Sequence, residues 1–462
     1  MPGTAREIGP GPSARLPTLG EATRVWVRIG LLSFGGPAGQ IALMHKELVE
    51  ERRWIGEDRF LHALNYCMLL PGPEAQQLAV YIGWLMHRTV GGLIAGLLFI
   101  LPGALVMLGL SILYVTWRHV PLIDGVFFGV KAAVLAIVIE AGLRISRRAL
   151  KTGAMVGVAV AAFAGIFLFR LPFPLIVLLA GLAGWFGNRA RPGWFGKAGA
   201  GDAEAAGEGL LDGLLARGEL GHIRPSARRA AGVMAVWLPL WLGPVVLFWL
   251  AAGSGSVWTQ IGGFFSAMAV VTFGGAYAAL AYVAQAAVEG FGWLAPGEML
   301  DGLGLAETTP GPLILVLEFV GFLAAFRAPG NLPPLVAGGL GALLTVWVTF
   351  APCFLWIFLG APYVEALRGN RAISAALGAI TAAVVGVIAN LALWFGLHVL
   401  FREVSSLSVL GMKPEVPVLT SLDWRAALLA AGAAIALLRF KLGMVPVLAI
   451  CAIAGIVLKG GF

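Results

Sequence analysis

The motif Ser33-Phe34-Gly35-Gly36, followed by Leu70-Pro71-Gly72-Pro73, decides how this chain of 462 residues folds. Both motifs return as Thr272-Phe273-Gly274-Gly275 and Thr309-Pro310-Gly311-Pro312, at a constant offset of 239 residues without gaps. The pairs that keep this register include Ser33 and Thr272, Glu50 and Glu289, Trp54 and Trp293, and Pro71 and Pro310. Two uncommon motifs that keep their spacing indicate an internal repeat, so we expect two related halves.

The composition places both halves in a membrane. Hydrophobic residues make up 59% of the chain and charged residues only 12%, whereas soluble proteins carry about 25% charged residues. The chain also has 64 glycines, and small residues let membrane helices approach one another closely. We therefore expect an all-α, polytopic membrane protein whose net charge of +8 comes from loops between membrane segments, without a nucleic-acid partner.

A helix that crosses the hydrocarbon core needs about 20 apolar residues, and on this measure we expect about 13 membrane segments in a 6+1+6 arrangement. They are 25–44, 60–86, 90–116, 122–142, 153–169, 172–186, 233–251, 260–286, 300–325, 333–359, 373–397, 425–440 and 443–458. The chain then divides into an N-terminal tail (1–24), a first transporter repeat (25–186), a linker (187–232), a linking transmembrane helix (233–251) and a second transporter repeat (260–458).

A single helix between two six-segment halves makes the halves run in opposite directions through the bilayer. Inverted-topology repeats are typical of secondary transporters, which alternate access to a central site. Lysine and arginine gather in the run from Arg144 to Lys151 and in the 187–232 linker. Because basic loops stay in the cytoplasm, we expect the N-terminal tail and the linker on the cytoplasmic side.

Pro-Gly-Pro in the middle of an apolar segment breaks a helix, since proline lacks the amide donor and clashes with the preceding turn. A broken backbone at membrane depth is tolerated only inside the protein or beside a water-filled cavity. The helix after each break directs free amides and its positive dipole end at the bilayer centre, where an anion can bind. The candidate substrate-binding residues of these motifs are Phe34, Gly35, Gly36, Pro71, Gly72, Pro73, Gly274, Gly275, Thr309, Pro310, Gly311 and Pro312.

Two alternatives stay open for these motifs. The breaks could be structural kinks that serve packing alone. The segments that carry them could also be re-entrant hairpins, broken helices that return to the side they came from, rather than full crossings. Two hairpins in place of two crossings leave the orientation of everything downstream unchanged.

Charged residues inside the apolar segments are further candidates. Lys131 lies well within a segment, where a lysine costs roughly 3 kcal/mol on insertion scales, and Arg28 lies shortly before Phe34. Both could balance a dianion. Alternatively, Arg28 snorkels to the interface and Lys131 forms a structural ion pair, for example with Glu140. The proton-coupling candidates are Glu74, Glu140 and Glu318, although Glu74 could instead cap the start of its helix.

Other functional classes lack their motifs. Cys67, Cys353 and Cys451 lie in apolar runs without a Cys-x-x-Cys pair, so we expect buried thiols and neither a metal site nor a disulfide. The sequence has no Gly-x-x-x-x-Gly-Lys-Ser/Thr loop and so no ATP-driven pump of that type. It also has no His-Glu-x-x-His motif and no nucleophile elbow, and we expect neither a cofactor nor an enzyme.

Several stretches combine into a recognisable pattern. They are Ser33-Phe-Gly-Gly-Pro-Ala, Glu50-Glu-Arg-Arg-Trp54, Leu70-Pro-Gly-Pro, Gln77-Leu-Ala-Val-Tyr-Ile-Gly83, Leu101-Pro102, Gly129-Val-Lys131, Thr272-Phe-Gly-Gly and Thr309-Pro-Gly-Pro. Together they resemble the chromate ion transporter family in its long, two-domain form. The resemblance implies export of chromate, a tetrahedral dianion shaped like sulfate, across the inner membrane of a bacterium. It also implies substrate contacts from Arg28, Gln77, Lys131 and both glycine-containing motifs.

On this resemblance, membrane potential or a proton gradient drives the export. The runner-up is import or exchange of sulfate or a related oxyanion, and a distant alternative is an integral membrane enzyme or lipid-handling protein. Two residues depart from the family pattern: Gln40 stands where many relatives have histidine, and Glu74 where a small polar residue is common. The acid at position 74 favours proton coupling. A homodimer is a further expectation.

Overall fold

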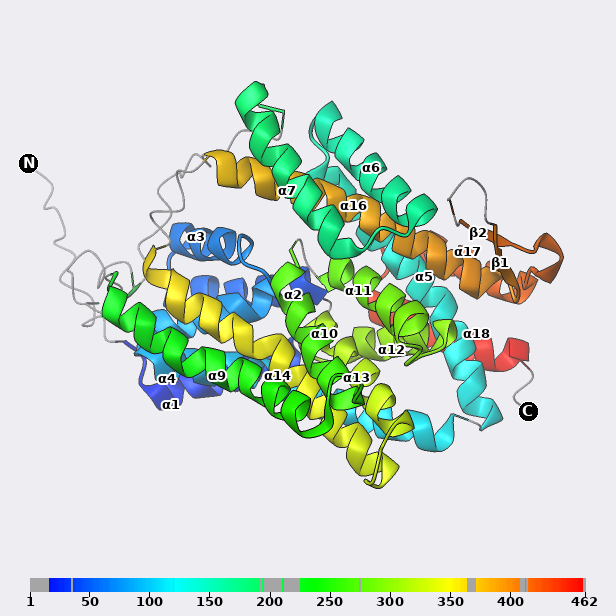
Figure 1. Ribbon diagram of the computed structural model, residues 1–462, viewed down its shortest axis with the longest axis horizontal. Helices are drawn as coiled ribbons and strands as arrows, with labels where there is room; N and C mark the ends of the chain where they lie inside the picture. Colours follow the sequence, from blue (N-terminus) through cyan, green and yellow to red (C-terminus); the bar gives the residue numbers. More distant parts are fainter. Residues whose placement is uncertain are drawn as a thin grey trace, which may run out of the picture.

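The computed structural model describes residues 16–34, 36–118, 120–191, 193–194, 210–211, 225–273, 276–363, 371–407, 412 and 414–459. In Figure 1 these residues form a single bundle of helices. The start of α9 and the end of α14 lie at its left end, and a small β-hairpin and the end of α18 lie at its right end.

The first half contains α1 (Leu19–Leu32), α2 (Gly36–His45), the π-turn η1 (Lys46–Glu51), α3 (Glu57–Cys67), α4 (Glu74–Trp117), α5 (Pro121–Ala149), α6 (Gly153–Phe169) and α7 (Phe173–Ala190). Helix α9 (Ala227–Ala252) follows by itself. The second half contains α10 (Val257–Val271), α11 (Ala276–Ala284), η3 (Gln285–Gly290), α12 (Pro296–Thr308), η4 (Leu313–Leu315), α13 (Val316–Arg327), α14 (Pro334–Gly360), η5 (Ala361–Tyr363), α16 (Arg371–Leu400), β1 (Val404–Ser406), β2 (Glu415–Pro417), η6 (Leu419–Ser421), α17 (Trp424–Leu438) and α18 (Met444–Lys459).

The prediction of a helical, polytopic membrane protein is confirmed. Among the residues that the structure describes, six helices are long and apolar enough to cross a membrane, namely α4, α5, α7, α9, α14 and α16, and the shorter apolar helices α6, α10, α17 and α18 accompany them. The hairpin of β1 and β2, in which Val404 pairs with Pro417, was not predicted and makes the chain not wholly α-helical. The expected segment count and repeat boundaries stay predictions.

Four of the expected segments are broken in the structure. In segment 25–44, α1 ends at Leu32 and α2 begins at Gly36, and in segment 60–86, α3 ends at Cys67 and α4 begins at Glu74. Segments 260–286 and 300–325 are broken in the same way, between α10 and α11 and between α12 and α13. The 14 residues of α1 rise about 21 Å, short of the roughly 30 Å of a hydrocarbon core.

Two hydrogen bonds show where the ends of the broken segments lie. The residues His87 and Arg88 interrupt α4, and the ring of His87 hydrogen-bonds the carbonyl of Pro17, just before α1, at 2.8 Å. In the second half, Arg327 at the end of α13 donates to the carbonyl of Trp293, just before α12, at 2.5 Å. The second bond brings the two ends of segment 300–325 together, as in a re-entrant hairpin. The first bond joins the start of one segment to the end of the next, which hairpins and full crossings both allow.

The first helix starts earlier than the expected boundary at residue 25. It begins at Leu19, because Thr18 and Glu21 form a capping box in which each side chain bonds the backbone amide of the other. Such a box satisfies two amides that the first turn leaves without an intrahelical acceptor. The end of the expected tail (1–24) is therefore helical.

The two halves exchange their final helix pairs. Helices α6 and α7 pack against α16 of the second half, while α17 and α18 pack against α5 of the first. Glycines permit the closest of these contacts: a Cβ on Gly129 would lie 1.7 Å from the carbonyl oxygen of Cys451, and one on Gly184 would lie 2.4 Å from that of Ala375. Each half thus depends on the other for its packing.

Candidate functional site

The Pro-Gly-Pro turns of the two halves meet the other half at matched positions. The amide of Gly72 donates to the carbonyl of Thr272 at 2.8 Å, and the amide of Gly311 donates to the carbonyl of Ser33 at 2.7 Å. The glycines have φ angles of +114° and +93°, a backbone conformation that other residues rarely adopt. We call the turns Leu70–Pro73 and Thr309–Pro312 the first and second tips.

Each tip is covered by a proline-containing helix of the opposite half. A Cβ on Gly103 of α4 would lie 2.1 Å from the carbonyl oxygen of Pro310 in the second tip. A Cβ on Gly72 in the first tip would lie 2.9 Å from the sulfur of Cys353 on α14. These contacts occur directly after Pro102 of α4 and Pro352 of α14, whose matching places in the two halves the sequence already indicates.

Free backbone amides follow both tips. Helix α4 starts after Pro73 and the turn η4 starts after Pro312, and neither start has a side-chain cap. The first amides of a helix have no intrahelical acceptor, so they attract anions. The amides of Gly72 and Gly311 differ, because they already donate to protein carbonyls.

Buried polar side chains lie beside both tips. Gln77 donates to the carbonyl of Pro71 at 2.7 Å and Gln40 donates to the carbonyl of Gly311 at 2.5 Å. The Oε1 atoms of both glutamines, the whole side-chain amide of Gln76 and Oε2 of Glu318 are buried and have no hydrogen-bond partner within the described part of the chain. Unpartnered polar groups are costly in an apolar interior, so these groups point to a place where a polar ligand or water fits.

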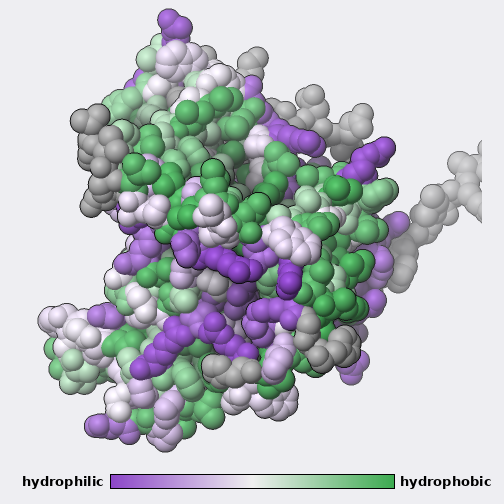
Figure 2. Space-filling view, turned by 90° about the vertical axis from the view of Figure 1, so that its right-hand side faces the viewer, coloured by the Kyte–Doolittle hydropathy of each residue, from purple (hydrophilic) through white to green (hydrophobic). Residues whose placement is uncertain are grey.

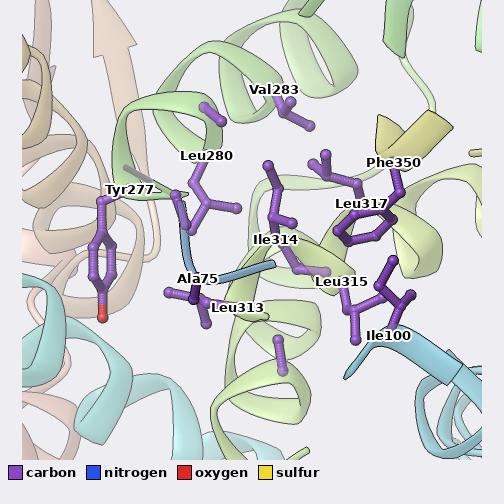
Figure 3. Close-up of a cluster of buried hydrophobic side chains, with 14 of the residues drawn as sticks. Ala75, Ile100, Tyr277, Leu280, Val283, Leu313, Ile314, Leu315, Leu317 and Phe350 are labelled. Carbon is purple, nitrogen blue, oxygen red and sulfur yellow. The ribbon is translucent and has the colours of Figure 1, made fainter. Parts of the chain in front are cut away.

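An apolar cluster closes the space next to the second tip (Figure 3). Buried side chains of the cluster are Leu313, Ile314 and Leu315 after the tip, Leu280 and Val283 of α11, Ala75 and Ile100 of α4, and Phe350 of α14. Figure 3 places the first three between α11 and the start of α4. Apolar side chains therefore fill the space beside the second tip.

Lys131 forms an ion pair with a residue of the other half. Its Nζ atom lies 3.3 Å from Oδ1 of Asp301 on α12, and the hydroxyl of Tyr114 on α4 donates to Oδ2 of the same carboxylate at 2.8 Å. The alternative of a structural ion pair for Lys131 is therefore present in the structure, with Asp301 as the partner. The suggested partner, Glu140, pairs instead with Arg144, one turn along α5, at 3.6 Å.

Arg28 has a carboxylate partner of its own. Its Nε atom lies 3.1 Å from Glu47, whose side chain is 2% exposed, while the Arg28 side chain is 54% exposed. Arg52 forms a second ion pair with Glu47. Phe34 is exposed, and Gly35, Gly274 and Gly275 lie outside the described residues. Arg28 and Lys131 therefore pair with different carboxylates, Glu47 and Asp301.

The sequence analysis missed three buried acids of α12. Besides Asp301, they are Glu298, which binds Arg118 of the first half and Arg327 at 2.7 Å, and Glu307, which accepts from the hydroxyl of Tyr277 at 2.9 Å. Asp301 and Glu307 lie inside the expected segment 300–325. Acids in a membrane segment are rare and mark functional sites, so the sequence alone could have identified both residues as candidates.

Among the candidate acids, Glu74 starts α4 and Glu318 is buried in α13. The three cysteines are free and buried, as expected. Within the described residues, no three His, Cys, Asp or Glu side chains gather into a group that could hold a metal ion.

Two pockets lie at opposite ends of α6. One, near the residues that precede α6, is lined by Glu140, Leu143, Arg144, Arg147, Arg148 and Leu438. The other, at the end of α6, is lined among others by Arg170, Glu289, Asn390, Trp394, Leu397 and Glu415. An offset of 250 residues relates the α5 positions 140, 144 and 147 of the first pocket to the α16 positions 390, 394 and 397 of the second. We call them the basic pocket and the acidic pocket.

The acidic pocket is held together by one arginine. Arg170 lies 3.3 Å from Glu289 and 3.4 Å from Glu415, so one cation faces two carboxyl groups. Figure 2 views the molecule from the hairpin end and shows hydrophilic side chains gathered in a hollow between apolar regions.

Comparison with known proteins identifies the family. The sequence profile of the chromate transporter family matches residues 20–185 and 259–456, which is most of the chain and both halves. The chain belongs to the chromate transporter family. A chromate transport protein of Pseudomonas aeruginosa is 33% identical over 374 residues, covering 79% of this chain and 77% of the relative.

Two further chromate transporter relatives have a similar extent. A chromate transport protein of Cupriavidus metallidurans is 29% identical and covers 80% of this chain and 81% of the relative. A probable chromate transport protein of Synechococcus elongatus is 27% identical and covers 81% and 83%. No solved structure matches. The chain is thus a membrane transporter of the long, two-domain form, not an enzyme.

Proposed function

We propose that this protein exports chromate from the bacterial cytoplasm by alternating access, with its halves arranged as inverted-topology repeats. The observation that carries the proposal is the reciprocal pair of hydrogen bonds, from Gly72 to Thr272 and from Gly311 to Ser33. Matched residues of two repeats that bond each other lie around a pseudo-two-fold axis. Transporters built from inverted repeats bind their substrate on such an axis, near the bilayer centre.

Chromate would bind between the tips after the apolar cluster opens. The amides that follow Pro73 and Pro312 are the better donors, because those of Gly72 and Gly311 are already occupied. Gln77 beside the first tip and Thr309 of the second tip, both buried, add polar side chains. Lys131 lies against Gly297 at the start of α12, about 18 Å along that helix from the second tip, so it would contact the anion on its way to the tips rather than between them. Helix starts that face an anion are a common arrangement for anion binding.

The charges of the two pockets favour the outward direction. With the N-terminus in the cytoplasm, the basic pocket with Arg144, Arg147 and Arg148 faces the cytoplasm, because these arginines follow α5 on the side of the linker. The acidic pocket with Glu289 and Glu415 then faces outward. A basic vestibule concentrates an oxyanion at its mouth and an acidic one disfavours its return.

The membrane potential can supply the energy. Each charge that crosses 100 mV gains about 2.3 kcal/mol, so a dianion that leaves a negative cytoplasm gains about 4.6 kcal/mol per 100 mV. The same term opposes import of sulfate, unless cations accompany it. A proton gradient could add to this drive through an acid such as Glu74, Glu140 or Glu318.

Chromate accumulation in cells tests the proposal. Cells that make the protein should hold less chromate than matched cells that do not make it. Higher accumulation would indicate import instead, and excess sulfate then identifies an importer of sulfate-like anions by competition. Equal accumulation in the two strains, measured without sulfate, would contradict both directions of transport.

A further inference from the structure

Asp301 forms one ion pair and accepts one hydrogen bond from the opposite half of the protein. Its side chain is 2% exposed, and Lys131 of α5 lies 3.3 Å from Oδ1. Tyr114 of α4 donates to Oδ2 at 2.8 Å. A carboxylate this deeply buried needs such partners, because an unpaired charge in an apolar interior is very costly.

Lys131 is less enclosed than its partner. Its side chain is 27% exposed, and its ammonium lies against Gly297, where a Cβ would approach Nζ to 3.1 Å. An ammonium has three donors, and Asp301 is the single carboxylate that pairs with it among the residues the structure describes. Lys131 can therefore receive a second anion from the exposed side.

Two anions cannot share this lysine without cost. A dianion within contact of Nζ would stand next to the carboxylate of Asp301, and like charges at such a distance repel strongly outside bulk water. The conflict disappears when Asp301 takes up a proton on Oδ1, the oxygen that faces Lys131. The other oxygen, Oδ2, can still accept from Tyr114 after protonation, so the acid keeps this hydrogen bond.

We propose that Asp301 is the internal counter-anion of Lys131, and that a bound oxyanion replaces it while one proton from solvent moves onto Oδ1 of Asp301. The proposal rests on the proposed function, since it takes Lys131 as a substrate contact. It makes Asp301, rather than Glu74, Glu140 or Glu318, the carboxyl group that links protons to anion binding.

The other charged groups around Asp301 are already paired. From α4, Arg118 binds Glu298, and from α13, Arg327 binds the same Glu298 at 2.7 Å. Helices α16 and α18 also pack against α12, and the terminal lysine of α18, Lys459, binds Asp124. On α12 itself, Glu307 accepts from Tyr277. Asp301 and Lys131 are therefore the pair whose partners an incoming anion can exchange.

Binding measured as a function of pH tests this inference. For the purified full-length protein, we expect the affinity for chromate, in a range where chromate stays a dianion, to fall about tenfold per pH unit once Asp301 ionises. An indicator dye in weak buffer should report uptake of one proton per bound anion. The variant Asp301→Asn, which is neutral at every pH, should bind chromate without proton uptake and without this pH dependence.

Matched variants distinguish a linked proton from a general effect. Asp124→Asn removes another ion-paired carboxylate on the helix of Lys131 and should behave like wild type. If Asp301→Asn does not fold, Tyr114→Phe serves instead: loss of its hydrogen bond weakens the ionised carboxylate, so the fall in affinity should move to higher pH. Unchanged proton uptake in Asp301→Asn, an unmoved pH profile in Tyr114→Phe, or loss of uptake in Glu318→Gln or Glu140→Gln alone would overturn the inference.

Sulfate, used as a second probe, separates this inference from the proposed substrate. Proton uptake with sulfate that disappears in Asp301→Asn, in a protein that does not bind chromate, would uphold the role of Asp301 and contradict chromate as substrate. Chromate binding by wild type without proton uptake would uphold the substrate and overturn the role of Asp301. Absence of binding for both dianions would contradict both.

Discussion

The amide of Gly311 donates to the carbonyl of Ser33 at 2.7 Å, although 278 positions separate these residues in the sequence. The bond joins the turn at the end of α12 to the end of α1, and its counterpart from Gly72 to Thr272 repeats it with the halves exchanged. Both bonds require the positive φ of a glycine. Movement of one half against the other therefore acts on both bonds.

Replacement of Gly72 by alanine should disable this connection. The φ of +114° is strained for any side chain, and the added Cβ would lie 2.9 Å from Cys353 and 3.0 Å from Gln77. We expect a loss of roughly 1–3 kcal/mol of stability and a large loss of transport, measured by thermal unfolding in detergent and by chromate uptake into vesicles. Gly339→Ala, at a helical position of α14 with nothing within 4 Å, is the control and should leave both unchanged. Full transport by Gly72→Ala would refute a need for this conformation.

Replacement of Gly129 by alanine should separate α5 from α18. The new Cβ would lie 1.7 Å from the carbonyl oxygen of Cys451, which is backbone and cannot rotate away. We expect a destabilisation of about 1–3 kcal/mol, the usual result of overpacking, seen as a lower unfolding temperature. The matched control is Gly157→Ala on α6, which meets nothing within 4 Å. Equal stability of the two variants would contradict the close contact of α5 and α18.

Replacement of Lys131 by methionine should abolish transport and also destabilise the protein. The change leaves Asp301 buried without its cation, and breaking one side of a buried ion pair costs about 3–5 kcal/mol. Adding Asp301→Asn should restore most of the stability, because asparagine can still accept from Tyr114, but it should not restore transport. Thermal unfolding and transport measured on both variants separate the two effects. Transport by the single variant would remove Lys131 from the site.

Cysteine labelling should establish the orientation. The native cysteines Cys67, Cys353 and Cys451 are buried, so they give little background. A cysteine in place of the exposed Ser405 of β1 should react with an impermeant maleimide in intact cells, because the hairpin lies on the outer side in our proposal. A cysteine in place of the exposed Ser226, before α9, should react only after the membrane is opened. The opposite pattern would place the N-terminus outside.

The sequence predicted the two helix breaks at the Pro-Gly-Pro motifs better than it predicted the contacts between the two halves. The recurring motifs located both tips, because proline and glycine act on the local backbone and their effect is readable residue by residue. The start of α1 could also have been predicted from the sequence, since Thr18 and Glu21 have the spacing of a capping box. The expected start at residue 25 was set from apolar content instead. The carboxylate that pairs with Lys131 could not be predicted from local sequence. Asp301 is 170 positions away, and only the tertiary fold brings it within 3.3 Å.

The exchange of the final helix pairs has a consequence for synthesis of the chain. Helix α5 is translated early, yet its glycine-lined face meets α18, whose last described residue is Lys459. Until the ribosome has released those late residues, that face stands open to lipid or to insertion factors. A premature stop within α18 would thus leave α5 without the helix that packs against it. We expect membrane proteases to degrade such a product, so that it does not persist as a slightly shortened transporter.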